Sequence, residues 1–391
     1  MAHAHFQMAP AYRTPASVRE ASLSERFWSM SWLLVLLTLA IACLGLSTLY
    51  SVAGGSAAPW MDKQAVRLVA GMGLMVLLAL LPLRFWLAIS WPMYLAALIL
   101  LVAVILIGTS AMGARRWLQF GQLSVQPSEI ARLALVLALA RYYQWLPRAR
   151  ISHPVCVAVP LLAIVAPMAM IIRQPDLGSG LLLLGTGLAI MFLAGVSLLY
   201  LLAGSIAAGV GAPLIWAHMK PYQQRRVTTF LDPEQDLLGA GYHIQQSKIA
   251  LGSGGLTGKG YLEGTQSSLN FLPEKHTDFI FTAFGEEMGY AGCLVLLLLY
   301  AAMLGWLVVM ALRCRNHFGR LAIGGVAMTL FLSVFVNVGM VTGVLPVVGV
   351  PLPLMSYGGT SMLTTLAGLG IAMAAYSNRQ QSVRPELLGF L

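Results

Sequence analysis

The chain is dominated by long apolar segments that alternate with short polar connections. A membrane helix needs about 20 mainly apolar residues to cross the hydrocarbon of a bilayer, and ten segments meet that requirement. We expect membrane-spanning helices over residues 32–50, 65–82, 86–108, 127–145, 155–172, 178–196, 198–217, 288–312, 320–343 and 358–376. The pattern predicts an all-α polytopic membrane protein with ten transmembrane helices.

The composition supports this fold class. Of the 391 residues, 58% are hydrophobic and only 10% are charged, whereas soluble domains carry about 25% charged residues. This excludes a soluble globular protein. The net charge of +10 is not gathered into a basic stripe with aromatic residues, so no nucleic-acid partner is expected. The four cysteines show no metal-binding spacing and imply no disulfide framework; they are Cys43, Cys156, Cys293 and Cys314.

The distribution of basic residues predicts the orientation, because Lys and Arg accumulate in short cytoplasmic loops. One set of connections, which includes both termini, holds many arginines and few acids. Its arginines are Arg13, Arg19, Arg26, Arg84, Arg141, Arg148, Arg150, Arg313, Arg315, Arg320, Arg379 and Arg384. We therefore expect cytoplasmic tails, 1–31 and 377–391, on either side of a membrane domain over 32–376. No small-residue cleavage site follows the first span, which argues against a removable signal peptide.

One connection on the opposite side, residues 218–277 between the seventh and eighth spans, is much longer than the others. Connections of this length are usually functional or disordered, and this one has too many apolar and aromatic residues for disorder. It contains an amphipathic stretch over 242–251 and a glycine-rich stretch over 252–260. The latter fails the phosphate-loop pattern, because Ser253 replaces a required glycine and Lys259 is followed by glycine. We expect a folded extracytoplasmic loop whose glycines permit tight turns and close backbone approach.

Polar residues cluster at the predicted outer ends of the spans. Glu129 and Arg132 lie on one face of the fourth span, where they form a simple ion pair or face a functional cavity. The cost of ionisable groups near the apolar region favours the cavity. Asp176 follows a proline before the sixth span, and capping and function are equally open. Trp117 is compatible with an interfacial aromatic belt.

Ionisable side chains also crowd the segment that leads into the eighth span, from Glu274 to Glu287. Asp278 is either a helix cap or a carboxylate with a raised pKa that acts as a general base. Glu286 and Glu287 are compatible with a role in complementing the helix dipole.

An uncharged stretch, residues 343–359, follows Asn337 near the end of the ninth span. Its three prolines, Pro346, Pro351 and Pro353, forbid a regular helix. Non-helical backbone at membrane depth needs protein or water around it, so the stretch lines a cavity or forms a structural hairpin.

Taken in order, these motifs resemble the SEDS family of bacterial cell-wall glycosyltransferases, the group that contains RodA and FtsW. The resemblance covers essentially all ten spans. The motifs that carry it are 116–117, 126–129, 174–178, 220–222, 241–244, 266–267, 272–274, 276–281, 285–287, Leu354 and 356–359. The segments 231–233, 239–244 and 343–353 resemble the elongation branch more than the division branch. One departure is Arg132, where the family commonly has lysine; a Lys-specific proton transfer is therefore not assigned there.

The resemblance implies polymerisation of lipid II outside the cytoplasmic (inner) membrane, in complex with a class B penicillin-binding protein and the elongation machinery, among membrane lipids. Asp278 matches the family's essential aspartate, and Glu129 matches an acidic residue near it. We expect Asp278 to be the base that activates the attacking hydroxyl. Cations offset the charge of the leaving diphosphate, and the candidates are Arg116, Lys220, Arg225 and Lys275. Further substrate-binding candidates are Trp117, Gln126, Arg132, Asp176 and His276. A divalent cation, Mg²⁺ or Mn²⁺, held by Glu129 and Asp278 would serve the same purpose.

Three alternatives stay open at this point. A flippase of lipid-linked precursors is compatible with ten spans, although most mid-membrane positions are uncharged. A division-type polymerase differs only in its branch of the family. A scaffold of the elongation machinery would leave the carboxylates without a task.

Overall fold

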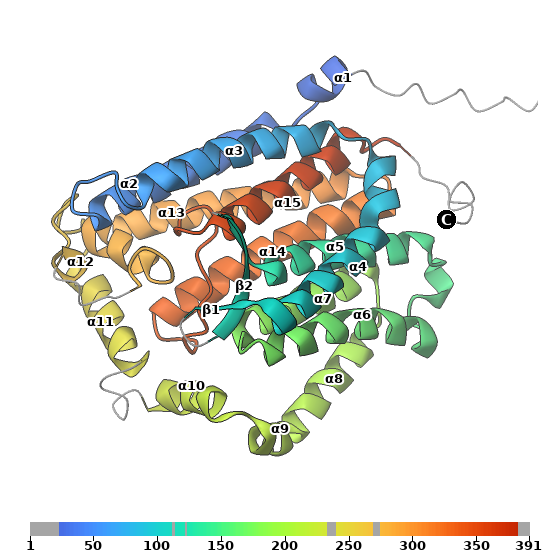
Figure 1. The fold of residues 1–391 in the computed structure, drawn as a ribbon. Helices are drawn as coiled ribbons and strands as arrows, with labels where there is room; N and C mark the ends of the chain where they lie inside the picture. Colours follow the sequence, from blue (N-terminus) through green and yellow to red (C-terminus); the bar gives the residue numbers. More distant parts are fainter. Residues whose placement is uncertain (1–22, 112–113, 122, 233–239, 269–273, 382–391) are drawn as a thin grey trace, which may run out of the picture.

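The computed structural model describes residues 23–111, 114–121, 123–232, 240–268 and 274–381. Long helices run side by side and form the body of the protein (Figure 1). The predicted tails lie largely outside the described residues. The longer helices are α2 (Trp32–Val52), α3 (Met61–Leu80), α4 (Leu83–Ile107), α5 (Pro127–Trp145), α6 (Pro154–Arg173), α7 (Leu177–Ala194), α13 (Ile280–Arg313), α14 (His317–Val341) and α15 (Gly359–Ser377). The shorter ones are α1 (Leu23–Trp28), η1 (Arg148–Arg150), α8 (Leu198–Val210), α9 (Ala212–His218), α10 (Pro221–Leu231), α11 (Ala240–Ser253) and α12 (Thr265–Ser268).

Every predicted span falls on a helix. Seven helices are long and apolar enough to cross a membrane, namely α2, α3, α4, α6, α7, α13 and α14. The predicted span 198–217 falls on α8 and α9, which together pass the same test but are bent by 51°. The other two predicted spans coincide with α5 and α15. The described chain is therefore a multi-pass membrane protein with seven such helices, or eight if the bent pair is one span.

Helices α5 and α15 occupy the interior of the bundle. Helix α5 packs against α4, α7 and α14, and α15 packs against α3. Both carry long runs of buried residues, 134–140 in α5 and 368–376 in α15. Polar side chains are tolerated in such helices because they meet protein partners rather than lipid.

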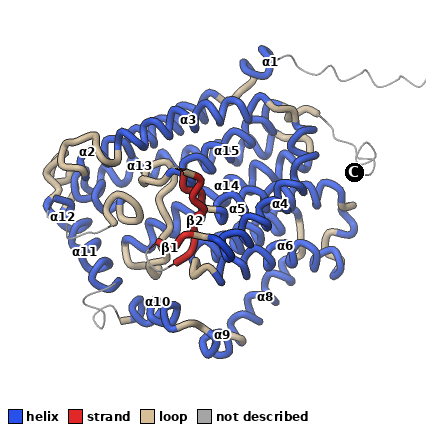
Figure 2. Tube along the Cα trace, viewed as in Figure 1, coloured by secondary structure: helices blue, strands red, loops and turns tan. Residues whose placement is uncertain are grey.

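The expectation of an all-α fold is wrong in one place. The connection between α4 and α5 forms a three-stranded antiparallel sheet in the order β1 (Thr109–Ala111), β2 (Ala114–Phe120), β3 (Leu123–Val125) (Figure 2). The N–H and C=O groups of this polar connection are not hydrogen-bonded within a helix. Antiparallel pairing of the strands supplies hydrogen bonds for them. Strand β2 thereby fixes the positions of Arg116 and Trp117.

The long connection over 218–277 contains α10, α11 and α12. The stretch 242–251 lies within α11. Helices α8, α9 and α10 run along one edge of the structure (Figure 1), and α8 has no buried residue.

Close backbone approach explains the glycine-rich stretch, as expected. Helix α13 is interrupted at Gly289, whose φ of 66° lies in the left-handed region. At this kink the N–H of Tyr290 donates to the carbonyl of Gly255 at 2.9 Å. A Cβ on Gly258 would lie 2.0 Å from the carbonyl oxygen of Glu287, and one on Gly289 would lie 2.2 Å from the nitrogen of Gly258. Two glycines at one contact therefore let the loop dock into the kink.

We predict that Gly289→Ala destabilises the protein by about 2 kcal/mol or more, because it adds a steric clash to a strained backbone. The matched control is Gly305→Ala in the same helix, where nothing lies within 4 Å of a new Cβ. Thermal unfolding in detergent should show a lower Tm for Gly289→Ala and an unchanged or higher Tm for Gly305→Ala. Equal Tm values would contradict this account of the kink.

Candidate active site

Two non-helical segments meet next to the start of α13. One is the turn over residues 274–279, and the other is the loop over 343–358 that joins α14 to α15. The N–H of Tyr357 donates to the carbonyl of His276 at 2.9 Å. The hydroxyl of Ser356 donates to the carbonyl of Thr277 at 2.6 Å and accepts from the N–H of Leu352 at 2.7 Å. The proline-rich stretch is therefore the wall against which the turn is built.

Asp278 lies on this turn, two residues before α13. Asp278 is partly exposed to solvent. Many protein atoms nevertheless surround its carboxylate. It does not cap α13, whose N-cap is Phe279 and has no side-chain hydrogen bond. The pKa of Asp278 is raised to about 6, first because burial disfavours the charged carboxylate and second because Glu274 is negatively charged. Arg116 and Arg226 lower this pKa, and Asp176 raises it. The carboxylate therefore titrates close to neutral pH, as a general base should.

The two residues that precede Thr277 and Asp278, Lys275 and His276, pack against the protein. The ring of His276 stacks on Trp60, with centroids 4.5 Å apart and planes 15° apart, and lies 5.9 Å from the ring of Tyr357. Burial lowers the pKa of His276 and also that of the buried Lys275. His276 is therefore mainly neutral at neutral pH and stabilises the turn.

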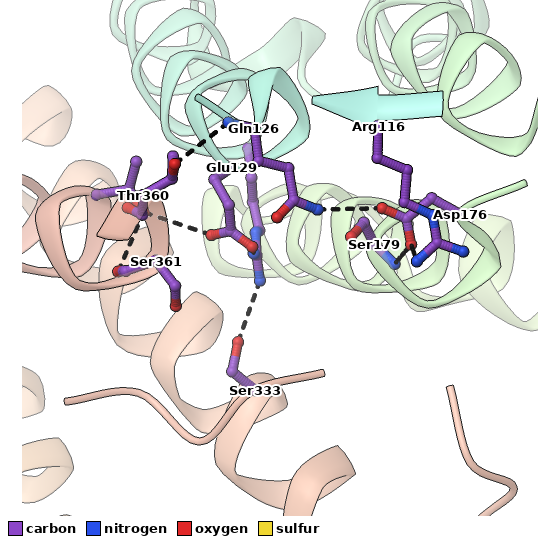
Figure 3. A network of polar contacts seen from close by, with 10 residues as sticks. Arg116, Gln126, Glu129, Asp176, Ser179, Ser333, Thr360 and Ser361 are labelled. Atoms are coloured by element: carbon purple, nitrogen blue, oxygen red, sulfur yellow. Dashed lines mark hydrogen bonds and ion pairs between the residues drawn. The ribbon is translucent and has the colours of Figure 1, made fainter. Parts of the chain in front are cut away.

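Arg116, Gln126 and Asp176 come together from three elements (Figure 3). Asp176 caps α7 by accepting from the N–H of Ser179 at 3.3 Å, so the capping interpretation is confirmed. The same carboxylate accepts from the Gln126 side chain at 3.2 Å and lies 3.7 Å from Arg116. Arg116 also donates to the carbonyl of Pro175. The Arg116–Asp176 ion pair joins β2 to the start of α7. Both side chains act electrostatically on Asp278.

Trp117, the neighbour of Arg116 on β2, is half-buried. Its carbonyl accepts a hydrogen bond from the Thr109 hydroxyl at 3.2 Å, and in register it pairs with Thr109 of β1. The sheet thus sets its place beside Arg116.

Glu129 and Arg132 form the predicted ion pair at 2.5 Å. Arg132 also donates to the hydroxyl of Ser333 on α14 at 3.1 Å, and the hydroxyl of Thr364 on α15 lies 3.4 Å from Glu129. Figure 3 shows Glu129 and Ser333 in this network. The ion pair lines a cavity of about 40 Å³ whose wall includes Val350. One water needs about 10–15 Å³, so the cavity has room for water beside the two charges. The ion pair therefore exists and faces a cavity, and the functional role of that cavity stays a prediction.

The basic residues of the long connection divide into two groups. Lys220 and Arg225 are exposed at the start and on the outer side of α10. Arg226 instead points inward, donates to the carbonyl of Val348 at 3.3 Å, and favours the charged form of Asp278. Arg226 was not among the predicted site residues. The sequence could not distinguish it from Arg225, because the helix phase of α10 decides which of two adjacent arginines faces inward.

Glu286 and Glu287 do more than complement a helix dipole. The fully buried Glu286 pairs with Lys259 at 2.7 Å and accepts from the N–H of Gln266 at 2.9 Å. Glu287 accepts from the hydroxyl of Ser51. These carboxylates fasten the loop over 258–266 and helix α2 to α13.

The described residues do not by themselves form a site for a resident metal ion. Among them, no group of three or more His, Cys, Asp or Glu side chains is placed to hold one. The charge of Glu129 is already balanced by Arg132. The predicted metal stays a prediction.

Comparison with known proteins identifies the family. The family model for cell cycle proteins of the FtsW, RodA and SpoVE type matches residues 27–381. The chain belongs to this family. It is 42% identical over 366 residues to the peptidoglycan glycosyltransferase MrdB of Escherichia coli K12, and the match covers 91% of this chain and 96% of MrdB. It is 32% identical over 351 residues to a probable peptidoglycan glycosyltransferase FtsW of Geobacter sp. M18, covering 87% and 95% of the two chains.

Solved structures agree with this membership. One belongs to a peptidoglycan synthase complex that coordinates polymerization and crosslinking. It matches with a TM-score of 0.79 and 36% identity, and the match covers 90% of this chain and 99% of that chain. The crystal structure of RodA from Thermus thermophilus matches with a TM-score of 0.69 and 32% identity over 90% and 98%. The predicted SEDS resemblance is confirmed.

We predict that Arg132→Met destabilises the protein by about 3 kcal/mol, because it leaves the largely buried Glu129 carboxylate, whose side chain is 11% exposed, without its partner. The double variant Glu129→Gln/Arg132→Met removes both charges and should regain part of the lost Tm. Thermal unfolding of the two single variants and the double variant in detergent measures this coupling. Additive losses in Tm would show that the two side chains act independently.

Proposed function

We propose that this family member is a peptidoglycan glycosyltransferase that polymerises lipid II at the outer face of the bacterial cytoplasmic membrane during cell elongation. The names of its relatives and its identity to MrdB support the reaction and the elongation role. The observation that carries the catalytic assignment is a closely surrounded carboxylate, Asp278, whose pKa is raised to about 6 and on which two guanidinium groups act electrostatically. The flippase and scaffold interpretations leave this arrangement without a use.

The proposed topology has ten spans with both termini in the cytoplasm. Helices α5 and α15 count as spans because their polar side chains face protein, and α8 with α9 counts as one bent span. The connection over 218–277 then lies outside, on the same side as Asp278. The arginine-rich connections support this orientation.

In the proposed reaction, the 4-hydroxyl of one lipid II attacks the anomeric carbon of the growing chain. Asp278 accepts the hydroxyl proton as the new glycosidic bond forms, and the bond to undecaprenyl diphosphate breaks with its electron pair on the diphosphate. An inverting displacement of this kind needs a base on one face and charge stabilisation on the other. Arg116 and Arg226 lie close enough to act on Asp278 electrostatically and are suited to the diphosphate, with Lys220 and Arg225 on α10 as further cations.

We propose a class B penicillin-binding protein as the partner. The structural relative that coordinates polymerization with crosslinking supports this pairing. Such a partner would join the strands that this chain makes, within the elongation machinery and its surrounding lipids.

The direct test is polymerisation of purified lipid II by the protein reconstituted with its penicillin-binding partner. Asp278→Asn should reduce glycan synthesis by about 100-fold or more, because the general base is lost, with an unchanged Tm. The matched control is Asp62→Asn, an exposed aspartate at the start of α3, which should keep full activity. Equal products from wild type and Asp278→Asn would exclude Asp278 as the base, and lipid transport without polymerisation would indicate a flippase.

The pH dependence of the rate should report the charge of Glu274. The base works when deprotonated, so the rate should rise through about pH 6. Glu274→Gln removes a negative charge that raises the pKa of Asp278, so this rise should move to lower pH, by less than about 1 unit. Glutamine still accepts from the Thr277 hydroxyl, which lies 2.7 Å from the Glu274 carboxylate. Glu263→Gln, at an exposed glutamate, is the control and should leave the profile in place; a shift of both would point to a general charge effect.

The proposed Mg²⁺ or Mn²⁺ is tested by the same assay in chelator. If a divalent ion bound by Glu129, Asp278 and substrate oxygens assists the leaving group, chelation should abolish most of the activity and added Mg²⁺ should restore it. Full activity in chelator would remove the metal from the proposal.

A further inference from the structure

Asn337 is a fully buried amide near the end of α14 that neither the mechanism nor the predicted site includes. Its Nδ2 donates to the carbonyl of Asp278 at 2.9 Å and to the carbonyl of Val350 at 2.7 Å. The Asn337 Oδ1 is buried and has no hydrogen-bond partner among the described residues. The amide is thus oriented so that both of its N–H groups donate hydrogen bonds, although its oxygen is left without a partner among the described residues.

The two carbonyls belong to different non-helical segments. Asp278 lies on the turn before α13, and Val350 lies between the prolines of the loop before α15. Buried carbonyls outside helices need donors from elsewhere, and one amide with two hydrogens supplies both. The Asp278 turn and the proline-rich loop are thereby tied at one point.

This contact completes a series. The three consecutive carbonyls of residues 276, 277 and 278 accept from the Tyr357 N–H, the Ser356 hydroxyl and the Asn337 amide. The first two donors come from the loop itself, whereas Asn337 comes from a long transmembrane helix. Of these three, only Asn337 connects the turn that carries the base to rigid secondary structure outside the loop.

The helix has a second polar contact on the same face. Ser333, four residues before Asn337 and therefore its neighbour on the helix surface, accepts from Arg132 at 3.1 Å. Through Ser333 and Asn337, α14 holds both the Glu129–Arg132 pair and the backbone of Asp278. The spacing of two side chains on one helix thus sets the base relative to the cavity.

We infer that Asn337 is a positioning residue for glycosyl transfer: its side-chain amide holds the Asp278 turn and the Val350 loop against α14 and so places the base. This inference rests on the proposed function, since it assigns a role in that reaction. A base displaced by about 1 Å can lose about 100-fold in rate without any change in substrate binding. Asn337 should therefore act on kcat and leave KM nearly unchanged.

The test is steady-state lipid II polymerisation by the reconstituted protein with its penicillin-binding partner, normalised to folded, monodisperse protein. Asn337→Leu keeps the branched shape and the number of heavy atoms and removes both donors. Asn337→Asp keeps the shape and, when protonated, offers one donor to two carbonyls. Both variants should lower kcat at least tenfold with KM within about twofold of wild type. If Asn337→Leu does not fold, the Asp variant alone decides.

The matched control is Asn316→Asp, at the other end of α14. Asn316 is also buried, caps the helix by accepting from the N–H of Gly319, and donates to the carbonyl of Asn378 at 3.4 Å; aspartate keeps the cap. This variant should retain wild-type kcat.

An unchanged kcat in folded Asn337 variants, or an equal loss in Asn316→Asp, would overturn the inference. So would a rise in KM that accounts for the whole loss of rate. Failure of the proposed function looks different, because wild type and Asp278→Asn would then make equal products or none, and the inference would fall with it.

Discussion

Non-helical backbone inside a helical bundle is stable only if its buried carbonyls find donors, and this constraint organises the candidate site. The turn that carries Asp278 and the proline-rich loop over 343–358 are each short of hydrogen bonds on their own. They satisfy each other through Ser356 and Tyr357, and Asn337 anchors both to α14. Asp278 is therefore held through its backbone, which leaves its carboxylate free for the proposed role as a base.

Among the described residues, the charged side chains in and around the site fall into two classes: carboxylates in ion pairs, and the unpaired carboxylate of Asp278. Glu129 with Arg132, Asp176 with Arg116, and Glu286 with Lys259 are ion pairs that join separate parts of the chain. Asp278 forms no side-chain ion pair with the described residues, and burial together with Glu274 raises its pKa to about 6. The three ion pairs hold separate parts of the chain together. The arginines near Asp278 offset only part of the effect of burial and of Glu274, so the pKa of Asp278 stays raised.

The sequence predicted the helical membrane fold well, because long apolar runs have few alternatives. Of the residues it predicted for the site, the structure brings Arg116 and Asp176 close enough to act electrostatically on Asp278. The sequence analysis missed the small sheet, since its short strands lie in a polar connection without a clear period-two pattern. It also missed the inward position of Arg226 and the two-carbonyl contact of Asn337, because helix phase and contacts between distant segments depend on tertiary packing. The count of ten spans and the topology of the tails stay predictions.

The central claim is that the fold holds Asp278 as a carboxylate that titrates near pH 6. Infrared difference spectroscopy of the reconstituted protein, titrated with acid, measures this directly. The account predicts a protonated-carboxyl band with a midpoint near pH 6 that is absent from Asp278→Asn. A band that persists in the Asn variant, or an Asp278 midpoint close to about 4, the ordinary value for aspartate, would contradict it.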